Sequence, residues 1–433
     1  MSRTIPSAAI STDNNIRTIP SAAISTDNNI ETNYQTELVA LRAAEMAPYF
    51  TVGSKKYFSD QIAGKKRNGQ VYGFVIRDAG EVENSLAIGG SAKTDLVERV
   101  VNLSIEPWHN TVKTNAVEGK TDIDFDREVA EPYGLKLING ALKKSINKDV
   151  PKSATCFIGN KGEFEPLSQA SAHLASVTAE PLYGFVDPMI QAIVTSKGAQ
   201  FVPVSAPDMY KQGLIGNFHG ADYRAQRFLK SIKVPAALAT AMTGATFASF
   251  ADNVLTITLG SSAGSAFKIQ AGTPFFVDGI VACDLVGDET AQPYAFIAKE
   301  DVDVANAAAT IEIPVDDVDV SLGGTRVAAM EDGKAVVWTG DSKTVTTSTA
   351  VTGPAAGTYF VGIVRANGAY EFETLNEIDV ATADSKKGTV EGITIFQNRL
   401  IDLSNMKNDT RFDLFTISGT VEKRGQSLVL IKA

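Results

Sequence analysis

The stretch from Thr121 to Lys148 carries the strongest helical signals in the chain, and the rest of the sequence can be arranged around it. A Thr or Asp cap is followed by acidic residues in the first turn, and three lysines occupy the last turns, so both ends complement the helix dipole. Four apolar residues fall within an arc of about 80° on a helical wheel: Leu135, Ile138, Leu142 and Ile146. We predict one long amphipathic helix. Pro132 lies between this stripe and Phe125, and because proline has no backbone N–H it removes one hydrogen bond of the helix there.

Length and composition bound the class of protein. A chain of 433 residues with 44% apolar residues can fill about two to three domains. It has no run of 18 apolar residues, and residues 1–30 lack the apolar core of a signal peptide, so we expect a soluble protein made in the cytoplasm. Cys156 and Cys283 lie far apart without metal-ligand spacing, which argues against disulfides and zinc. A net charge of −10 argues against a chain that coats nucleic acid through a basic face, and residues 65–67 (Lys-Lys-Arg) are interpreted as a solvated loop.

The N-terminus contains an internal repeat. Residues 3–16 recur unchanged as residues 17–30. Two copies of a polar unit cannot bury a face, because a solenoid needs at least about three repeats. Residues 1–34 are therefore interpreted as a recent duplication, an artefact or a flexible arm that does not carry the fold.

Residues 35–120 predict a helix followed by a long hairpin. Helical spacing covers residues 36–46, and strand-like runs at 71–76 and 99–105 flank a segment rich in Gly and charge. The two runs contain too few apolar residues to build a core of their own. We therefore predict an extended hairpin that reaches away from the body and needs another surface to lie against.

The long helix is assigned to residues 121–152, and residues 153–234 predict an α/β unit. Residues 154–159 have the pattern of a buried strand, and residues 166–177 that of a helix with one apolar face. The alternation continues with a helix capped by Asp187-Pro188, a strand at Phe201–Val204 and a helix opened by Ser205-Ala206-Pro207.

Pro235 marks a change from helical to two-residue periodicity. Short strands predominate from there to the end of the chain, and three dipeptides stand between such strands at the spacing of tight hairpin turns: Asp278-Gly279, Asp332-Gly333 and Asn367-Gly368. We predict that residues 235–351 are an inserted antiparallel β domain with its own core. Residues 352–433 are predicted to return to the body as strands.

Candidate catalytic residues are few. Residues 260–264 match the Gly-x-Ser-x-Gly nucleophile elbow, with Ser262 as the nucleophile, but strand rather than helix is predicted after them. All three histidines, His109, His173 and His219, precede Ser262, which contradicts the chain order of that hydrolase class. Their spacing is not that of metal ligands either.

Acidic and glycine-rich clusters also give no site. The acidic clusters lack the spacing of a calcium loop and are interpreted as solvated loop edges; they comprise Asp284, Asp288 and Glu289, then Glu300, Asp301 and Asp303, then Asp316, Asp317 and Asp319. Gly213, Gly216 and Gly220 resemble a phosphate loop but lack its GK[ST] ending and following helix. We therefore predict no catalytic, cofactor-binding or metal-binding residues.

The order of the predicted elements resembles that of a known family. Phe267–Ile280, followed by Pro293–Phe296 and Thr310–Pro314, has a lysine-glycine turn, a short hairpin, a strand before an acidic loop and a strand ending in Pro. Gly216–Pro235 and Gly392–Leu414 add a Val-Pro exit and a closing pair of strands. Together these stretches resemble the major capsid proteins of tailed phages, most of all the short-tailed phage coat proteins that carry an inserted β-barrel.

The resemblance implies an α+β capsid fold of the Hong Kong phage type, with a hairpin arm, a long spine helix, an α/β axial domain and an inserted antiparallel β-barrel. It implies a non-enzymatic protein that self-assembles, as hexamers and pentamers, into an icosahedral virion shell around double-stranded DNA, without a cofactor or membrane contact. Scaffolding, portal and decoration proteins are the implied partners. The alternatives are a hydrolase with an accessory β domain and a decoration or polysaccharide-binding β protein.

Overall fold

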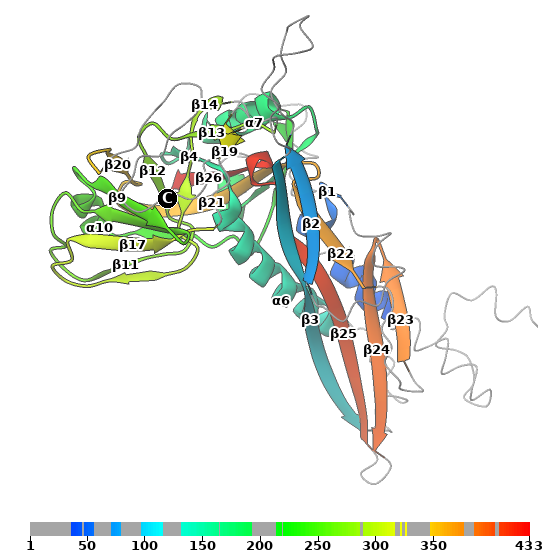
Figure 1. The fold of residues 1–433 in the computed structure, drawn as a ribbon. Helices are drawn as coiled ribbons and strands as arrows, with labels where there is room; N and C mark the ends of the chain where they lie inside the picture. The colour runs from blue at the N-terminus through cyan, green and yellow to red at the C-terminus, as the bar shows by residue number, and fades with distance from the viewer. Residues whose placement is uncertain are drawn as a thin grey trace, which may run out of the picture.

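A computed structural model describes residues 36–45, 47–55, 71–78, 97–115, 131–163, 165–192, 214–218, 220–285, 289–316, 321–322, 325–326, 347–375, 385–402 and 407–433. The fold is α+β and consists mostly of strands, as predicted. An elongated sheet with a helix along it joins a more compact part, which contains a second sheet and the inserted strands (Figure 1). The N-terminal repeat and the hairpin tip lie outside the described residues.

The elongated sheet, here called sheet A, is built around β25 (Lys407–Thr420). One part of β25 pairs with β24 (Ile393–Asp402) and the next part with β22 (Tyr370–Thr374), while β3 (Val97–Asn115) pairs with β25 over Ile105–Asn115. β23 (Ser385–Val390) and β1 (Ser54–Lys55) extend the sheet on β24 and β22. All pairs are antiparallel except that of β1 with β22.

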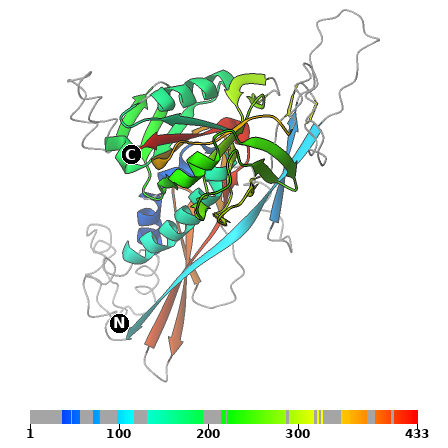
Figure 2. The same cartoon turned by 90° about the vertical axis from the view of Figure 1, so that its left-hand side faces the viewer.

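The predicted hairpin strands pair with each other. β2 (Val71–Asp78) lies antiparallel to the first part of β3, from Val71 opposite Ser104 to Asp78 opposite Val97. Because β3 continues from this ribbon into sheet A, hairpin and sheet form one ladder that runs along the elongated part (Figure 2). The 19 residues of β3 span roughly 60 Å at the usual rise of a strand.

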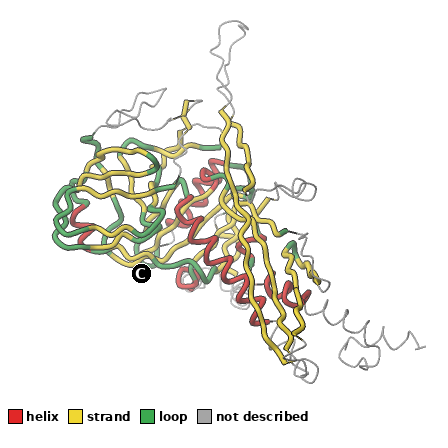
Figure 3. The backbone as a smooth tube through the Cα atoms, turned by 60° about the horizontal axis from the view of Figure 1, so that its bottom comes forward, coloured by secondary structure: helices red, strands yellow, loops and turns green. Residues whose placement is uncertain are grey.

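Two helices pack against sheet A. α6 (Glu131–Asp149) lies on β3 and β25 and follows the direction of the strands (Figure 3). Ile138, Leu142 and Ile146 of the predicted apolar stripe are buried. Residues 36–45 form the other helix, and a Cβ on Gly134 would lie only 2.8 Å from the backbone oxygen of Val39, so glycine lets the two helices approach closely. The predicted first turns of the long helix, residues 121–130, lie outside the described residues.

The compact sheet, here called sheet C, runs in the order β4 (Thr155–Gly159), β26 (Gln426–Lys432), β21 (Gly357–Ala366), β5 (Leu182–Val186), β7 (Ala221–Ala225) and β6 (Leu214–Phe218), and β8 (Ile232–Val234) also pairs with β21. Helix α7 (Glu165–Val177) covers one face, where Leu167, Ala170, Leu174 and Val177 are buried as predicted. Of the three glycines that resemble a phosphate loop, Gly216 lies within β6, Gly220 lies in the turn before β7 and Gly213 lies outside the described residues. The closing strand β26 is buried and lies between β4 and β21 in sheet C.

Beyond sheet C, residues 188–192 form the start of the helix expected after Asp187, whose Oδ1 accepts a 2.8 Å hydrogen bond from the N–H of Met189. This cap confirms the predicted start of the helix. The strand and helix predicted over residues 201–212 lie outside the described residues. A short helix, α3 (Pro48–Thr51), and two 3-10 turns, η3 (Val150–Lys152) and η4 (Lys423–Gly425), complete the body.

The region after Pro235 contains helix α10 (Ala236–Ala241) and short strands in separate small sheets. Among the described residues these strands form ladders of two or three: β9 (Thr246–Ala251), β10 (Val254–Thr258) and β17 (Thr310–Pro314); β11 (Phe267–Ile269) and β16 (Val302–Val304); β12 (Pro274–Val277), β15 (Phe296–Ile297) and β20 (Val351–Thr352); β13 (Val281–Cys283) and β14 (Glu289–Pro293); β18 (Ser321–Leu322) and β19 (Thr325–Arg326). Isolated bridges join the two three-stranded ladders at both edges, between Thr246 and Ala350 and between Ala298 and Val315. Val234 pairs with Gly357, so the chain leaves and re-enters sheet C at adjacent points.

Two of the predicted hairpin turns do not close hairpins. Asp278-Gly279 is a turn, but β12 pairs with β15 and β20 while β13 pairs with β14. Asn367-Gly368 is also a turn, and it passes the chain from β21 in sheet C to β22 in sheet A. The dipeptides fix the local reversal correctly, whereas packing decides the strand partners. Asp332-Gly333 lies outside the described residues.

The two-residue hairpin turns that the structure describes were not recognised in the sequence. Asp252-Asn253 joins β9 to β10, and Glu391-Gly392 joins β23 to β24. All four residues have positive φ, from 50° to 81°, which is the geometry of a type I′ turn. The Asp-Asn dipeptide was the available signal, since both residue types tolerate this conformation.

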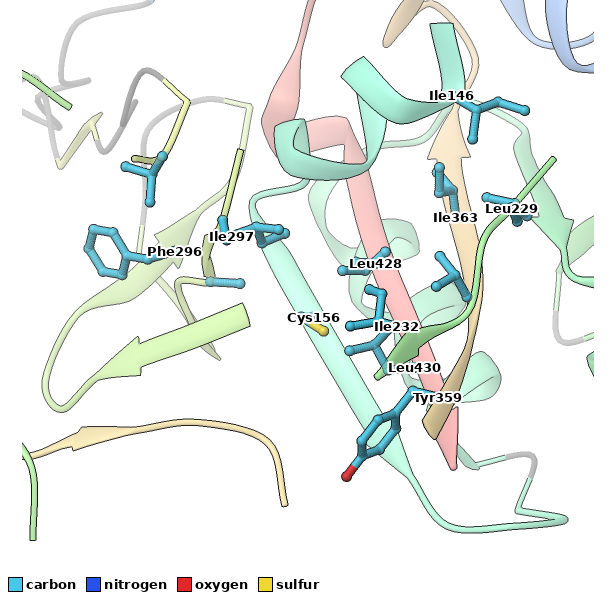
Figure 4. Packing of buried hydrophobic residues seen from close by; sticks show 14 of the residues in the cluster. Ile146, Cys156, Leu229, Ile232, Phe296, Ile297, Tyr359, Ile363, Leu428 and Leu430 are labelled. Atoms are coloured by element: carbon cyan, nitrogen blue, oxygen red, sulfur yellow. The ribbon is translucent and has the colours of Figure 1, made fainter. Parts of the chain in front are cut away.

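The buried apolar cluster of the insertion continues into that of the body. Phe296 and Ile297 belong to the same buried cluster as Cys156, Ile232 and Leu428 of the body (Figure 4). At the same contact the N–H of Ala295 donates a 2.9 Å hydrogen bond to the carbonyl of Ala154. The insertion and sheet C therefore share one continuous apolar cluster, and the private core of the insertion stays a prediction. The boundaries at residues 235 and 351 stay a prediction.

Candidate functional site

The residues considered as catalytic candidates are dispersed over the structure. Ser262 is exposed in the loop between β10 and β11, with strand rather than helix after it. His109 is exposed on β3 opposite Asp413. His173 is buried in α7, and His219 lies outside the described residues. No group of three His, Cys, Asp or Glu side chains in the described part of the chain could hold a metal ion.

His173 packs as an uncharged core residue. Its ring lies 5.9 Å from that of Phe157, and burial lowers its pKa from 6.5 to about 4. A neutral imidazole in this position contributes to the contact of α7 with β4.

The acidic clusters contribute ion pairs where they are described. Asp301 lies 3.0 Å from the Nζ of Lys268 and accepts a 2.9 Å hydrogen bond from the N–H of Ala271. Asp316 is largely buried, and its Oδ2 lies 3.2 Å from the Nζ of Lys423 without hydrogen-bond alignment. Glu300 and Asp303 are exposed, as the reading of solvated loop edges predicted. Asp288, Asp317 and Asp319 lie outside the described residues.

The densest cluster of buried polar groups was not predicted. We call it the joint, and it comprises Tyr49, Ser145, Asp149, Arg365 and Tyr370, all of which are buried. These residues come from α3, the end of α6, the end of β21 and the start of β22. The joint therefore lies where the chain passes from sheet C to sheet A.

Arg365 occupies the centre of the joint. Its guanidinium carbon lies 4.1 Å from the ring centroid of Tyr370 and 4.6 Å from those of Tyr49 and Phe185. Its Nη2 donates hydrogen bonds to the carbonyls of Tyr49 and Val52, the latter at 2.8 Å. Nε and Nη1 have no hydrogen-bond partner among the described residues. The charge is thus stabilised chiefly by three aromatic faces rather than by a carboxylate.

Asp149 is a buried carboxyl group that acts electrostatically on Arg365. Its Oδ2 accepts hydrogen bonds from the hydroxyls of Tyr49 at 3.0 Å and Ser145 at 3.1 Å. Its Oδ1 accepts from the N–H and hydroxyl of Thr420, both at 3.3 Å. Tyr49 therefore bridges the two charges, because its ring stacks on the cation while its hydroxyl binds the anion.

Burial sets the protonation of the joint. Desolvation lowers the pKa of Arg365, although Tyr49, Tyr370 and Asp149 oppose this shift. Burial raises the pKa of Asp149, opposed by Lys152 and by the hydrogen bond from Tyr49. Burial and the charge of Asp149 also raise the pKa values of Tyr49 and Tyr370. Because every member is buried and contacts residues of both sheets or of α6, the arrangement fixes the two sheets against each other.

The sequence contains only a weak signal of the joint. Arg365 ends an otherwise apolar strand, Tyr359–Arg365, and a charge in such a run is uncommon unless it is paired. Its partners lie hundreds of residues away in the sequence, at Tyr49 and Asp149, so no local pattern could bring them together.

Several surfaces remain exposed. Among the described residues the large apolar side chains at the surface are Leu41, Ile158 and Met189, on three separate elements. α6 presents Lys136, Lys143, Lys144 and Lys148 on its outer side. No helix in the described part of the chain is both long and apolar enough to cross a membrane.

Comparisons with known proteins give structures but no relatives in sequence. No protein-family model and no curated protein matches the chain. A structure from Mycobacterium phage Che8 is 10% identical, covers 87% of this chain and 89% of its own, and has a TM-score of 0.43. The mature capsid of bacteriophage PhiM1 is 7% identical over 84% of this chain and 82% of its own, with a TM-score of 0.40. The capsid of the cyanophage P-SCSP1u is 9% identical over 84% of both chains, with a TM-score of 0.41. All three TM-scores lie below 0.5.

Proposed function

We propose that the chain is a major capsid protein that self-assembles into the icosahedral shell enclosing phage double-stranded DNA, without catalysis. The observation that carries the proposal is the ribbon of β2 and β3. In the described part of the chain β2 pairs only with β3, and the ribbon then merges into sheet A. A two-stranded ribbon is marginally stable in water on its own. A neighbouring copy that covers it would supply the missing contact, as closed shells of identical subunits do.

The rest of the architecture supports the same reading. Sheet A and α6 form an elongated part beside a compact sheet C, and the joint fixes the two. A subunit of a closed shell needs such a rigid, extended shape, because each copy has to contact several others in fixed directions. In this proposal residues 121–152 belong to the spine helix, residues 153–234 to the axial domain and residues 235–351 to the insertion. The capsid fold of the Hong Kong phage type and closure of the insertion into a barrel belong to the same proposal.

The partners and location follow from the proposed role. Copies of the chain would form hexamers and pentamers in the host cytoplasm and remain in the virion. Scaffolding and portal proteins would direct closure, and a decoration protein could bind the outer surface. The rival hydrolase reading finds no support at Ser262, since the loop that carries it is not followed by the helix of a nucleophile elbow.

Assembly of the purified full chain tests the proposal. Negative-stain microscopy and sedimentation should show closed or aberrant shells together with free subunits. Replacing residues 72–103 by a short Gly-Ser linker should leave folded subunits that do not close, whereas Ser262→Ala should assemble like the wild type. A wild-type protein that stays monomeric at high concentration, with or without host lysate, would count against the proposal. Loss of an esterase activity in Ser262→Ala would support the hydrolase instead.

A further inference from the structure

The outer side of α6 is a basic surface on an acidic protein. Lys136, Lys143, Lys144 and Lys148 are exposed on it, and we call these four residues the lysine face. Between Pro132 and Lys148 the helix contains no acidic residue, and Asp149 after them is buried in the joint. The chain as a whole has a net charge of −10, so this local surplus of positive charge runs against the composition.

Ion pairs within the described structure explain only two of the four lysines of the lysine face. The Nζ atoms of Lys144 and Lys148 form ion pairs with Oε1 of Glu106 on β3, at 3.1 Å for Lys144. Lys148 also lies in the last turn, where a positive charge complements the helix dipole. Lys136 and Lys143 stand further from the end of the helix and form no ion pair with any described residue. Four lysines against the single Glu106 leave a local charge of +3.

Two of the four charges form a row along the helix axis. Lys136 and Lys143 are seven residues apart, so they lie about 20° apart on the wheel and roughly 10 Å apart along the axis. Lys144 lies about 100° around the helix from Lys143, on the side of β3, with its Nζ 5.5 Å from the ring centroid of Trp108. Trp108 in turn packs on Gly140, where a Cβ would lie 3.3 Å from the ring. Phosphates on one strand of a DNA duplex advance by about 3.4 Å along its axis, so such a row can follow the backbone for several phosphates.

We infer that the lysine face binds the phosphate backbone of double-stranded DNA, weakly and without sequence preference. The inference rests on the proposed function, because the enclosed DNA is the polyanion that a shell subunit would meet. An acidic protein segment is the less suitable partner. Helical and extended peptides are usually held by apolar anchors beside the charges, and none of the exposed large apolar side chains of the described residues lies on α6.

Weak binding is consistent with an acidic shell wall. Two to four phosphate contacts give a log–log dependence of the binding constant on salt with a slope of about −2 to −4. The affinity then falls steeply at physiological salt, so DNA is positioned near the wall without being trapped there. The net charge of −10 on the chain opposes a wider contact with DNA.

Fluorescence anisotropy with the unassembled full chain and a mixed-sequence DNA duplex tests the inference. Lys136→Ala with Lys143→Ala should reduce the magnitude of the salt slope by about 2. The matched control, Lys161→Ala with Lys230→Ala, changes two exposed lysines on other elements and should leave the slope unchanged. Equal loss in both double variants, or no binding by the wild type at low salt, would overturn the inference.

Two further measurements separate the inference from its rivals. Polyglutamate of matched charge should compete far less well than DNA, and equal competition would assign the face to an acidic protein instead. Lys136→Gln with Lys143→Gln, checked by circular dichroism, guards against a folding defect. Shell formation is scored separately by microscopy. If the double variant forms shells but binds DNA less well, both proposals are supported. If the wild type binds DNA but forms no shells, only the capsid assignment is contradicted.

Discussion

Two internal contacts connect the parts of this chain, and they differ in the polarity of the side chains that form them. The joint connects sheet A to sheet C through Arg365, Tyr49 and Asp149, all without solvent exposure. The contact of the insertion with sheet C, which we call the seam, lies where Ile297 meets the part of the apolar cluster that contains Cys156, Ile232 and Leu428. The joint is polar and charged, whereas the seam is almost wholly apolar.

A polar contact and an apolar contact constrain the orientation of the parts they join to different degrees. Apolar packing stabilises in proportion to the area it buries and tolerates small shifts, so the seam can attach the insertion without fixing its orientation closely. A buried cation among three aromatic rings has one good position, and displacing it leaves charges and carbonyls without partners. The joint therefore fixes the angle between the sheets, and the seam supplies stability.

The largest expected effect is at the joint. Arg365→Ala removes a cation from between three rings and leaves the carbonyls of Tyr49 and Val52 and the carboxylate of Asp149 without their positive neighbour. We expect a loss of about 5 kcal/mol in the free energy of unfolding, measured by urea titration of the free subunit. The control Arg411→Ala breaks a 2.7 Å ion pair at a half-exposed arginine and should cost less than about 1 kcal/mol.

A double replacement tests whether the joint fixes the orientation of the two sheets as well as contributing stability. Arg365→Met with Asp149→Asn removes both charges and keeps an acceptor oxygen for the hydrogen bonds to Asp149, so we expect part of the lost stability to return. If the joint fixes orientation, this double variant should be more stable than Arg365→Ala and still form fewer regular shells than the wild type. Equal unfolding midpoints for Arg365→Ala and Arg411→Ala would show that the joint contributes no more than a surface pair.

The second effect is at the seam. Ile297→Ala removes a buried side chain that faces the body, so we expect a loss of about 3 kcal/mol in the free energy of unfolding. Ile297→Val, as the matched control, should cost about 1 kcal/mol. Because the core is shared, insertion and body should unfold in one transition in both variants. A separate early transition of the insertion, seen by calorimetry, would support an independent core.

Sequence patterns predicted elements far better than they predicted partners. Helix α7 and strand β4 lie within a residue of their predicted bounds, because periodicity and turn residues act locally. The partners of β12 and β21 were wrong. An X-Gly dipeptide specifies that the chain reverses, but the edge that a strand then pairs with depends on packing elsewhere.

The joint shows the same limit at the level of a site. Its residues lie at positions 49, 145, 149, 365 and 370, and each looks ordinary in its own segment. Only the meeting of two sheets makes Arg365 a buried cation in an aromatic cage. The seam was missed for a related reason, since apolar strands in the insertion and in the body predict two cores as readily as one.

The smallest expected effect is at the ion pair of Asp316 in the insertion with Lys423 of η4, which we call the rim of the seam. The stability that this pair contributes and that of the joint should depend on pH in opposite directions. Burial raises the pKa of Asp316, but Lys423, Lys152 and Lys299 more than offset this and lower it below its usual value. A carboxylate with a lowered pKa stabilises the fold above its unfolded value of about 4, and this stability is lost as the pH falls through the folded value. Asp149 has the opposite sign, because its raised pKa makes the ionised form costly at neutral pH and acid relieves that cost.

Asp316→Asn should therefore cost about 1 kcal/mol at pH 7 and little at pH 3, measured as the free energy of unfolding at the two values. Lys299→Ala, which removes the more exposed and more distant lysine of the cluster at 3.9 Å, is the control and should cost less at both. The effect should also shrink in high salt, since the pair is partly solvated. An Asp316→Asn loss that is the same at pH 3 as at pH 7 would show that packing of the side chain, and not its charge, closes the rim of the seam.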